Sequence, residues 1–176
     1  MSKRCFALLI AGVLAAQSTV AAEHGSTSEA LIGSWALESR VTTDRDGAVV
    51  TDANLSAAPS GLLIYDRSGH VAAQLSRPAR TPSMLAGECE QAQKIKGTPD
   101  TAQTILGYDA YFGTYTVDAA HGIVTHHLES ALFPGDIGKN IERRFTLSGD
   151  TLTIRFDTTQ GDGKAVTRTL VWRRLK

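Results

Sequence analysis

The stretch from Tyr111 to Leu147 concentrates side chains that can donate, accept or carry protons. They are Tyr111, Tyr115, His126, His127, Glu129, Arg143 and Arg144. These residues alternate with apolar ones, and a period of two is the pattern of a β-strand, because successive side chains point to opposite faces. A sheet with His, Tyr and Arg among the apolar side chains of one face predicts a barrel with a partly polar interior. Such an interior is suited to holding a small ligand.

The adjacent histidines His126 and His127 cannot both line one cavity or bind one metal ion, because neighbouring residues of a strand face opposite sides. His126 shares its face with Val124 and Leu128, which favours the interior for that face. We therefore predict that His126 points inward and His127 points to solvent. The alternative for His126 is an interior histidine that forms hydrogen bonds without binding or transforming a ligand.

Two tyrosines and an arginine extend this predicted lining. Tyr111 and Tyr115 share one strand face, and each combines an apolar ring with one hydroxyl group. Arg143 shares a face with Phe145 and Leu147. A buried guanidinium must be paired or must meet an anionic or carbonyl group. The alternatives are core packing for the tyrosines and a structural acid for the arginine.

Tyr65 and Gln74 complete the predicted ligand-binding set, although the sequence does not fix which way they face. A tyrosine and a histidine that meet across a dry cavity are suited to acid–base chemistry on an enolisable substrate. Isomerisation or cyclisation of such a substrate needs no cofactor. The chain has no Gly-x-Ser-x-Gly turn and no phosphate-binding loop, so no residue is assigned a catalytic role.

No metal site or cofactor is predicted. His70, His121 and His126 are separate in the sequence, and nothing in it brings them together. The chain has two cysteines, Cys5 and Cys89. If Cys5 is removed with the N-terminal segment, the single Cys89 allows neither an internal disulfide nor a zinc site built from cysteine pairs. The fold must then be held by its core.

Turn signals made of Asp and Gly recur at short intervals along the chain. The runs between them are rich in β-branched, aromatic and aliphatic residues, which favour strands. Many short strands joined by hairpin turns predict an antiparallel sandwich or barrel. The predicted strands are residues 32–43, 61–65, 70–77, 111–117, 123–130, 140–147, 151–157 and 165–174.

One segment departs from this strand pattern. Thr98 is a suitable helix N-cap and Pro99 suits the first helical position, and apolar residues follow at helical spacing. We predict one short helix over residues 99–110. The preceding residues 77–97 form a long irregular connection, which is either a functional rim or an insertion.

The N-terminus has the pattern of a secretory signal peptide. Lys3 and Arg4 precede an apolar run over residues 5–16, which is too short to span a bilayer. Small residues lead up to Ala22, where we expect cleavage. We therefore expect a signal peptide over residues 1–22, a flexible segment over 23–30, one domain over 31–176, and a periplasmic or secreted protein. An uncleaved membrane anchor is the alternative.

The charge composition bounds the partners of the protein. The 176 residues contain 18 basic and 18 acidic side chains, and no basic patch stands out. Nucleic acid is therefore not an expected partner. After signal cleavage we also expect no stable insertion in a membrane, and the sequence does not determine the oligomeric state.

Motifs along the whole chain carry a family resemblance. Gly33-Ser34-Trp35 opens the first predicted strand, and Trp172-Arg173-Arg174 stands near the chain's end. In lipocalins, a Gly-x-Trp opens the first strand and an arginine from near the C-terminus packs on that tryptophan. The chain resembles the bacterial lipocalin-like domain family, of the calycin type, over about residues 31–175. The motifs that extend the resemblance are Gly61-Leu62-Leu63-Ile64-Tyr65, Gly69-His70, Arg77-Pro78, Gly107-Tyr108, Tyr111-Phe112-Gly113-Thr114-Tyr115, Val124-Thr125-His126-His127, Phe133-Pro134, Gly138 and Arg143-Arg144-Phe145.

The resemblance implies an all-β fold, a single closed antiparallel barrel of about 8–10 strands with one short helix and a cup-shaped interior. Barrels similar to it bind lipids or other small hydrophobic molecules. The chain lacks the Thr-Asp-Tyr loop motif and the disulfide of true lipocalins, so a transport function carries over only weakly. We predict non-covalent binding of a small, mainly hydrophobic molecule in the cavity. The alternatives are a cofactor-free isomerase or cyclase acting there, or a filled barrel without a ligand.

Overall fold

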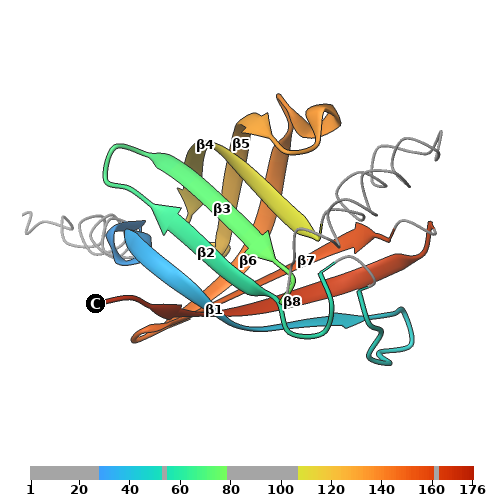
Figure 1. The fold of residues 1–176 in the computed structure, drawn as a ribbon. Coiled ribbons are helices and arrows are strands. Elements are labelled where there is room, and N and C mark those ends of the chain that lie inside the picture. Colours follow the sequence, from blue (N-terminus) through green and yellow to red (C-terminus); the bar gives the residue numbers. More distant parts are fainter. Residues whose placement is uncertain (1–27, 53–54, 79–106, 161–162) are drawn as a thin grey trace, which may run out of the picture.

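A computed structural model of the protein describes residues 28–52, 55–78, 107–160 and 163–176 (Figure 1). In these residues, eight antiparallel strands form a closed barrel, in which each strand pairs with its neighbours in sequence and the last pairs with the first. The strands are β1 (Gly33–Thr43), β2 (Ser60–Tyr65), β3 (His70–Ser76), β4 (Tyr108–Asp118), β5 (Ile123–Ala131), β6 (Asn140–Ser148), β7 (Thr151–Thr159) and β8 (Ala165–Arg174).

The predicted strands correspond one to one with those of the barrel, which confirms the all-β closed fold. The predicted helix over 99–110 is wrong at its end, because residues from Tyr108 onward belong to β4 and pair with β3. Its other residues lie outside the described part of the chain, as do the predicted signal peptide and nearly all of the 77–97 connection. The described helical turns are instead residues 28–31 and the 3-10 helix η1 (Pro134–Asp136).

One end of the barrel, here called the closed end, is sealed by Trp35. Its side chain is fully buried, and its Nε1 donates a hydrogen bond of 3.0 Å to the carbonyl oxygen of Leu31. The Arg174 guanidinium lies 4.0 Å from the Trp35 ring centroid and also donates to the Ile32 carbonyl oxygen at 2.7 Å. The packing of a C-terminal arginine on the first-strand tryptophan is therefore confirmed.

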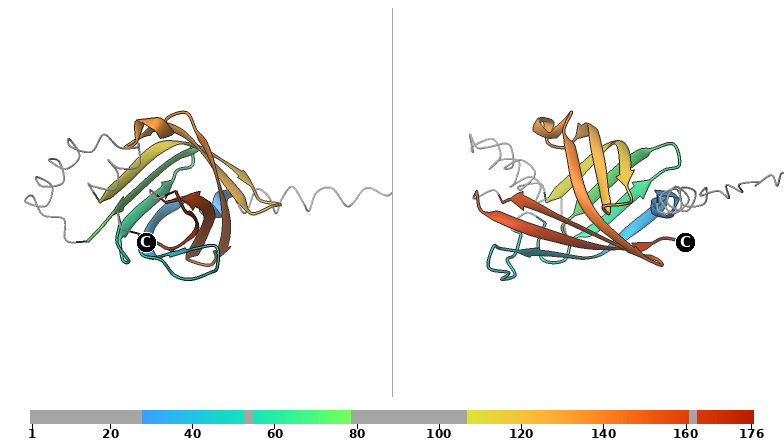
Figure 2. Two further views of the ribbon diagram at one scale, coloured as in Figure 1. Left: turned by 90° about the vertical axis from the view of Figure 1, so that its right-hand side faces the viewer. Right: turned by 180° about the vertical axis from the view of Figure 1, so that it is seen from behind.

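The hydrophobic core lies inside the barrel and receives side chains from all parts of the chain. Figure 2 shows the strands wrapping around this common interior. Alternation along each strand sends one set of side chains inward and the next outward. The inner set includes the fully or nearly fully buried Leu63, Val71, Val124, Leu152, Ile154 and Leu170.

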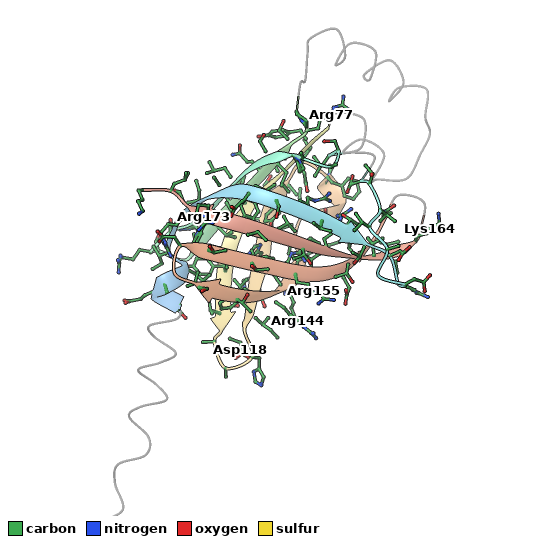
Figure 3. The ribbon with its side chains drawn as sticks, turned by 90° about the horizontal axis from the view of Figure 1, so that it is seen from below. Arg77, Asp118, Arg144, Arg155, Lys164 and Arg173 are labelled. Atoms are coloured by element: carbon green, nitrogen blue, oxygen red, sulfur yellow. The ribbon has the colours of Figure 1, made fainter. Side chains whose placement is uncertain are left out.

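Charged side chains occupy the outer faces of the same strands. Arg144, Arg155 and Arg173 are exposed on β6, β7 and β8, and Figure 3 shows them around the outside of the barrel. This alternation is what the sequence pattern predicts for a sheet with one wet face. In the described residues, no helix is long and apolar enough to cross a membrane.

Two irregularities in the strand pairing change which side chains face inward. The pairing of β1 with β8 shifts between Leu37 and Ser39. Trp35 before the shift and Arg40 after it are both buried, although strict alternation would put them on opposite faces. A β-bulge switches the facing of every later residue in its strand. The bulge thus brings Arg40 into the barrel.

The second irregularity lies between Phe112 and Gly113, where β4 pairs with β5. A Cβ atom at position 113 would collide with the His127 carbonyl oxygen. Only glycine therefore lets the two backbones approach this closely. The extra residue is Glu129 of β5, since Gly113 pairs with Leu128 and Phe112 pairs with Ser130. The bulge lets both Leu128 and Ala131 line the interior.

Candidate functional site

The barrel contains a cavity of about 470 Å³. It lies away from Trp35, toward the opposite end of the barrel, where β4 begins and β7 ends. We call this the cavity end. Pockets of a few hundred cubic ångströms suit small organic ligands. The apolar part of its wall includes Leu63, Ala73, Leu128, Ile154, Phe156 and Leu170.

Three side chains form a continuous hydrogen-bonded chain inside the barrel. The Tyr65 hydroxyl lies 2.7 Å from Nε2 of His126, and the Tyr111 hydroxyl lies 2.9 Å from Nδ1 of the same ring. Tyr65 and His126 are each 1% exposed. Tyr111 and His126 line the cavity, so the chain leads from the core at Tyr65 to the cavity wall at Tyr111.

All three groups of this Tyr65–His126–Tyr111 chain are uncharged near neutral pH. Burial, with smaller contributions from the positive charge of Arg143 and from His127, lowers the pKa of His126 to about 3. Burial raises the pKa of Tyr111 to about 12 and the pKa of Tyr65 well above its ordinary value. A neutral imidazole has one N–H donor and one acceptor nitrogen. His126 therefore donates to one tyrosine and accepts from the other.

The available donors and acceptors fix the direction of the hydrogen bonds in the Tyr65–His126–Tyr111 chain. Among the described residues, the Tyr65 hydroxyl has no partner besides His126, so its proton is satisfied only by donation to Nε2. A buried donor left without an acceptor costs about 1–3 kcal/mol. With Nε2 as acceptor, the imidazole proton sits on Nδ1 and is donated to the Tyr111 oxygen. The hydroxyl proton of Tyr111 then remains for an acceptor in the cavity.

Arg143 brings a positive charge to the same cavity. Its guanidinium stacks 3.7 Å from the centroid of the Phe156 ring, and its Nη1 donates to the Glu142 carbonyl oxygen at 3.1 Å. No described carboxylate lies within ion-pair distance of it. The structural acid considered as an alternative is thus absent from the described residues, and burial lowers the pKa of the guanidinium from its usual value.

A second charged group, the Arg40–Asp52–Arg168 cluster, lies at the cavity end. The Asp52 Oδ2 atom is 2.6 Å from Nη2 of Arg40 and 3.1 Å from Nη2 of Arg168. The other oxygen, Oδ1, accepts a hydrogen bond of 3.1 Å from the backbone N–H of Leu55. The cluster ties β1 and β8 to the segment after β1. All three charged side chains line the cavity, and the excess of arginine makes the cluster positive.

Asp109 is another carboxyl group of the cavity lining. It lies on β4, two residues before Tyr111, and both side chains line the cavity. Burial raises the pKa of Asp109 above its usual value, and the nearby Arg168 opposes this effect in part. Among the described residues it takes part in no ion pair. It is thus a buried carboxyl group that faces the cavity and forms no ion pair with a described cation.

The structure brings four of the six predicted ligand-binding residues together. Tyr111, His126 and Arg143 line the cavity, and Tyr65 supports His126 from behind. The predicted inward facing of His126 is confirmed. A role of these residues in ligand binding stays a prediction.

The other two predicted residues lie elsewhere. Tyr115 is inside the barrel, but its ring packs edge-on against Tyr65 at 4.8 Å and its hydroxyl donates to the Asp66 carbonyl oxygen at 3.0 Å. Its ring therefore packs in the core, and its hydroxyl binds the β2–β3 turn. Gln74 lies outside the cavity lining, because alternation in β3 turns Ala73 inward and Gln74 outward. The exposed Gln74 Oε1 accepts a hydrogen bond of 2.8 Å from the Tyr108 hydroxyl.

His127 lies outside the cavity, as predicted. Its Nδ1 is 2.7 Å from the Asn140 side-chain oxygen and its Nε2 is 3.0 Å from the Thr116 hydroxyl. Among the residues that the structure describes, no three His, Cys, Asp or Glu side chains are grouped so as to hold a metal ion.

Asp109, Arg40 and Asp52 are among the groups of the cavity wall that sequence reasoning missed. Asp109 was assigned to the predicted helix, although its spacing of two residues from Tyr111 would have identified it in an extended strand. Arg40 faces inward only because of the bulge in β1, which no local pattern indicates. Asp52 lies between strands, where periodicity carries no information.

A closed antiparallel barrel with an internal cavity lined by both apolar and polar side chains defines a binding protein of the lipocalin type. The lipocalin-like domain family matches residues 32–175. The chain therefore belongs to this family. In the comparison with curated proteins, none matches the chain.

Proposed function

We propose that the protein binds a small, mainly hydrophobic molecule non-covalently in the barrel cavity, with an acceptor oxygen of the molecule held by Tyr111 and Arg143. The observation that carries the proposal is a cavity of about 470 Å³ lined by apolar side chains together with polar and charged ones, Tyr111 and Arg143 among them. The apolar wall supplies affinity at about 25 cal/mol per Å² of apolar surface buried. The donors supply orientation.

The polar groups favour a ligand that accepts hydrogen bonds. Tyr111 has a hydroxyl proton for the cavity, and Arg143 has only donors. Desolvated donors without acceptors are costly, so a bound carbonyl or carboxylate oxygen would stabilise the site. A protonated amine in the same place would meet two donors and the positive charge of Arg143.

Native mass spectrometry of the protein purified from its source cells tests this proposal. We expect a stoichiometric small molecule that is released on denaturation. Arg143→Met should lose most of the bound molecule, because the guanidinium no longer holds the acceptor oxygen. Arg144→Met is the matched control, since Arg144 is exposed on the opposite face of β6. A mass without ligand, together with no uptake of added hydrophobic probes, would contradict the proposal.

A second candidate function is a cofactor-free isomerase or cyclase that acts on such a molecule in the cavity. The neutral Tyr65–His126–Tyr111 chain favours it, because such a chain can hold a donor at a reacting oxygen without charge of its own. His126→Gln distinguishes the two candidates. A binding protein would show weaker affinity and nothing else, whereas an enzyme would lose turnover while still binding.

We also propose that the protein works in the periplasm or outside the cell, on the basis of the signal-peptide pattern of residues 1–22. N-terminal sequencing of the purified protein tests this. A chain that begins at Glu23 supports the proposal, and a chain that retains the apolar segment contradicts it.

A further inference from the structure

We propose that the cavity transfers a proton at the carbon next to a ketone carbonyl, with Asp109 as the general base and with Tyr111 and Arg143 as donors to the carbonyl oxygen. This inference rests on the proposed binding function and deepens its second candidate. It depends on three kinds of group that face one cavity without neutralising one another: a directed hydroxyl donor, a cation and a carboxyl group. Separated acid and base groups in one dry pocket are the usual arrangement for such chemistry.

The donor side is fixed by the Tyr65–His126–Tyr111 chain. Tyr65 donates to Nε2 of His126, and the Nδ1 proton then goes to the Tyr111 oxygen. Tyr111 can therefore give its proton only to the cavity. Its pKa of about 12 keeps it protonated. A fixed donor of this kind stabilises negative charge that develops on an oxygen without having to reorganise. Tyr65 and His126 are positioning residues, since they act through Tyr111.

The base side is supplied by the same strand. Asp109 and Tyr111 are two residues apart on β4, so their side chains leave the same face of the strand next to each other. A substrate whose oxygen meets Tyr111 would thus have neighbouring carbon atoms within the space that Asp109 borders. Burial, and to a smaller extent Asp136, raises the pKa of Asp109, while Arg168, the backbone N–H of Ala110 and Arg40 lower it in part. A carboxylate with a raised pKa is a stronger base than an exposed one.

The proposed step balances without a cofactor. The Asp109 carboxylate takes a hydrogen from the α-carbon as a proton, and the electron pair of that C–H bond forms the enolate. The charge on the enolate oxygen meets the Tyr111 hydroxyl and the Arg143 guanidinium. The proton then returns from Asp109 to the same carbon, or to the γ-carbon of a β,γ-unsaturated ketone, which moves the double bond into conjugation. Nothing is oxidised or reduced, and the composition of the substrate is unchanged.

Exchange of α-hydrogens in D₂O tests the step without knowledge of the natural substrate. Two probes that differ in shape, methyl octyl ketone and benzylacetone, are incubated with the protein at neutral pD, and proton NMR follows the loss of the α-hydrogen signals. We expect exchange at least about a hundredfold above the buffer rate, in line with the usual size of general-base catalysis. Asp109→Asn should return the rate to that of buffer. Glu142→Gln, on the exposed face of β6, should leave it unchanged.

Saturation-transfer NMR with the same ketones measures binding separately from exchange. Binding without exchange would overturn the inference and leave the proposed function standing, whereas no binding by either ketone would overturn both. Equal exchange by Asp109→Asn and the wild type, with the same fold by circular dichroism, would also overturn it.

The positioning role of Tyr65 has its own readout. In the wild type, nitrogen-15 NMR should show the proton of His126 on Nδ1. Tyr65→Phe removes the donor to Nε2 and should shift the ring toward the other tautomer, with slower exchange. An unchanged tautomer would contradict the assigned direction of the chain.

Discussion

At the closed end of the barrel, polar groups satisfy one another; at the cavity end, several do not. Trp35 Nε1 donates to Leu31, and Arg174 both stacks on Trp35 and donates to the Ile32 carbonyl oxygen. At the other end, Arg143 and Asp109 face the cavity without an ion-pair partner among the described residues. Unpaired buried charge costs stability, so a barrel selected for stability alone would not retain it.

The contrast separates the residues that stabilise the barrel from the residues that line its cavity. The closed end uses the packing and hydrogen bonding that stabilise any small protein. At the cavity end, donors and a carboxyl group lack partners that a bound ligand would supply. Loss of stability in exchange for function is expected at such a site. Substitutions at the two ends should therefore differ in kind, with large losses of stability at one end and large losses of binding at the other.

The largest effect on stability is expected from Arg174→Ala. This change removes the stacking on Trp35 and leaves the Ile32 carbonyl oxygen without its donor. We expect a loss of about 2–4 kcal/mol in the free energy of unfolding, measured by urea denaturation. Arg173→Ala is the control, because its ion pair with Glu38 is exposed and worth at most about 1 kcal/mol. Equal losses in the two variants would show that the closed end is not specially stabilised.

A smaller effect is expected from pH, and it lies at the cavity end. The pKa of His126 is lowered from 6.5 to about 3 in the folded protein. As the pH falls below 6.5, the unfolded chain takes up a proton that the folded protein does not, so stability falls. The slope should correspond to uptake of about half a proton on unfolding at pH 6.5 and should rise to nearly one proton by about pH 5.

The comparison of two variants isolates this slope. His126→Phe should lose it, and His121→Phe should keep it, since His121 is exposed in the β4–β5 turn. The other titratable groups, Asp109 among them, are the same in both variants. A slope that is the same in both would mean that His126 is protonated in the folded protein.

The smallest effect on stability is expected from Arg143→Met. The substitution loses the contact with Phe156 but also removes a buried cation that has no carboxylate partner in the described chain. These effects oppose each other, so we expect the free energy of unfolding to change by less than about 1 kcal/mol. Denaturation of the ligand-free protein measures it. A loss above about 3 kcal/mol would show that Arg143 is a structural residue and would remove the contrast between the two ends.

The fold was predictable because it depends on local patterns that repeat. Turn residues mark the ends of each strand, and alternation fixes which side chains face inward, as His126 and Arg143 illustrate. Prediction failed where a non-local pairing overrode a local preference. Residues 108–110 were assigned to the end of the predicted helix, but hydrogen bonds to β3 place them in a strand.

The candidate site was predictable only in part, because facing can change within a strand. Arg40 turns inward after a bulge that is defined by the partner strand β8, so its own neighbours in sequence give no sign of it. Gln74 differs from Ala73 by one position, and a shift of one residue exchanges the two faces of a strand. The partnership of Tyr65 and His126, which are 61 residues apart, required the closed barrel to be known.

The seam between β1 and β8 joins the two ends of the sequence. Trp35 pairs with Arg174 across it, so the barrel closes only when almost the whole chain is present. Pairings between distant residues fold slowly, because the chain entropy is lost before the contacts form. A chain without its last strand would not make a smaller barrel. It would leave β1 and β7 with unpaired edges, which are templates for association with other chains.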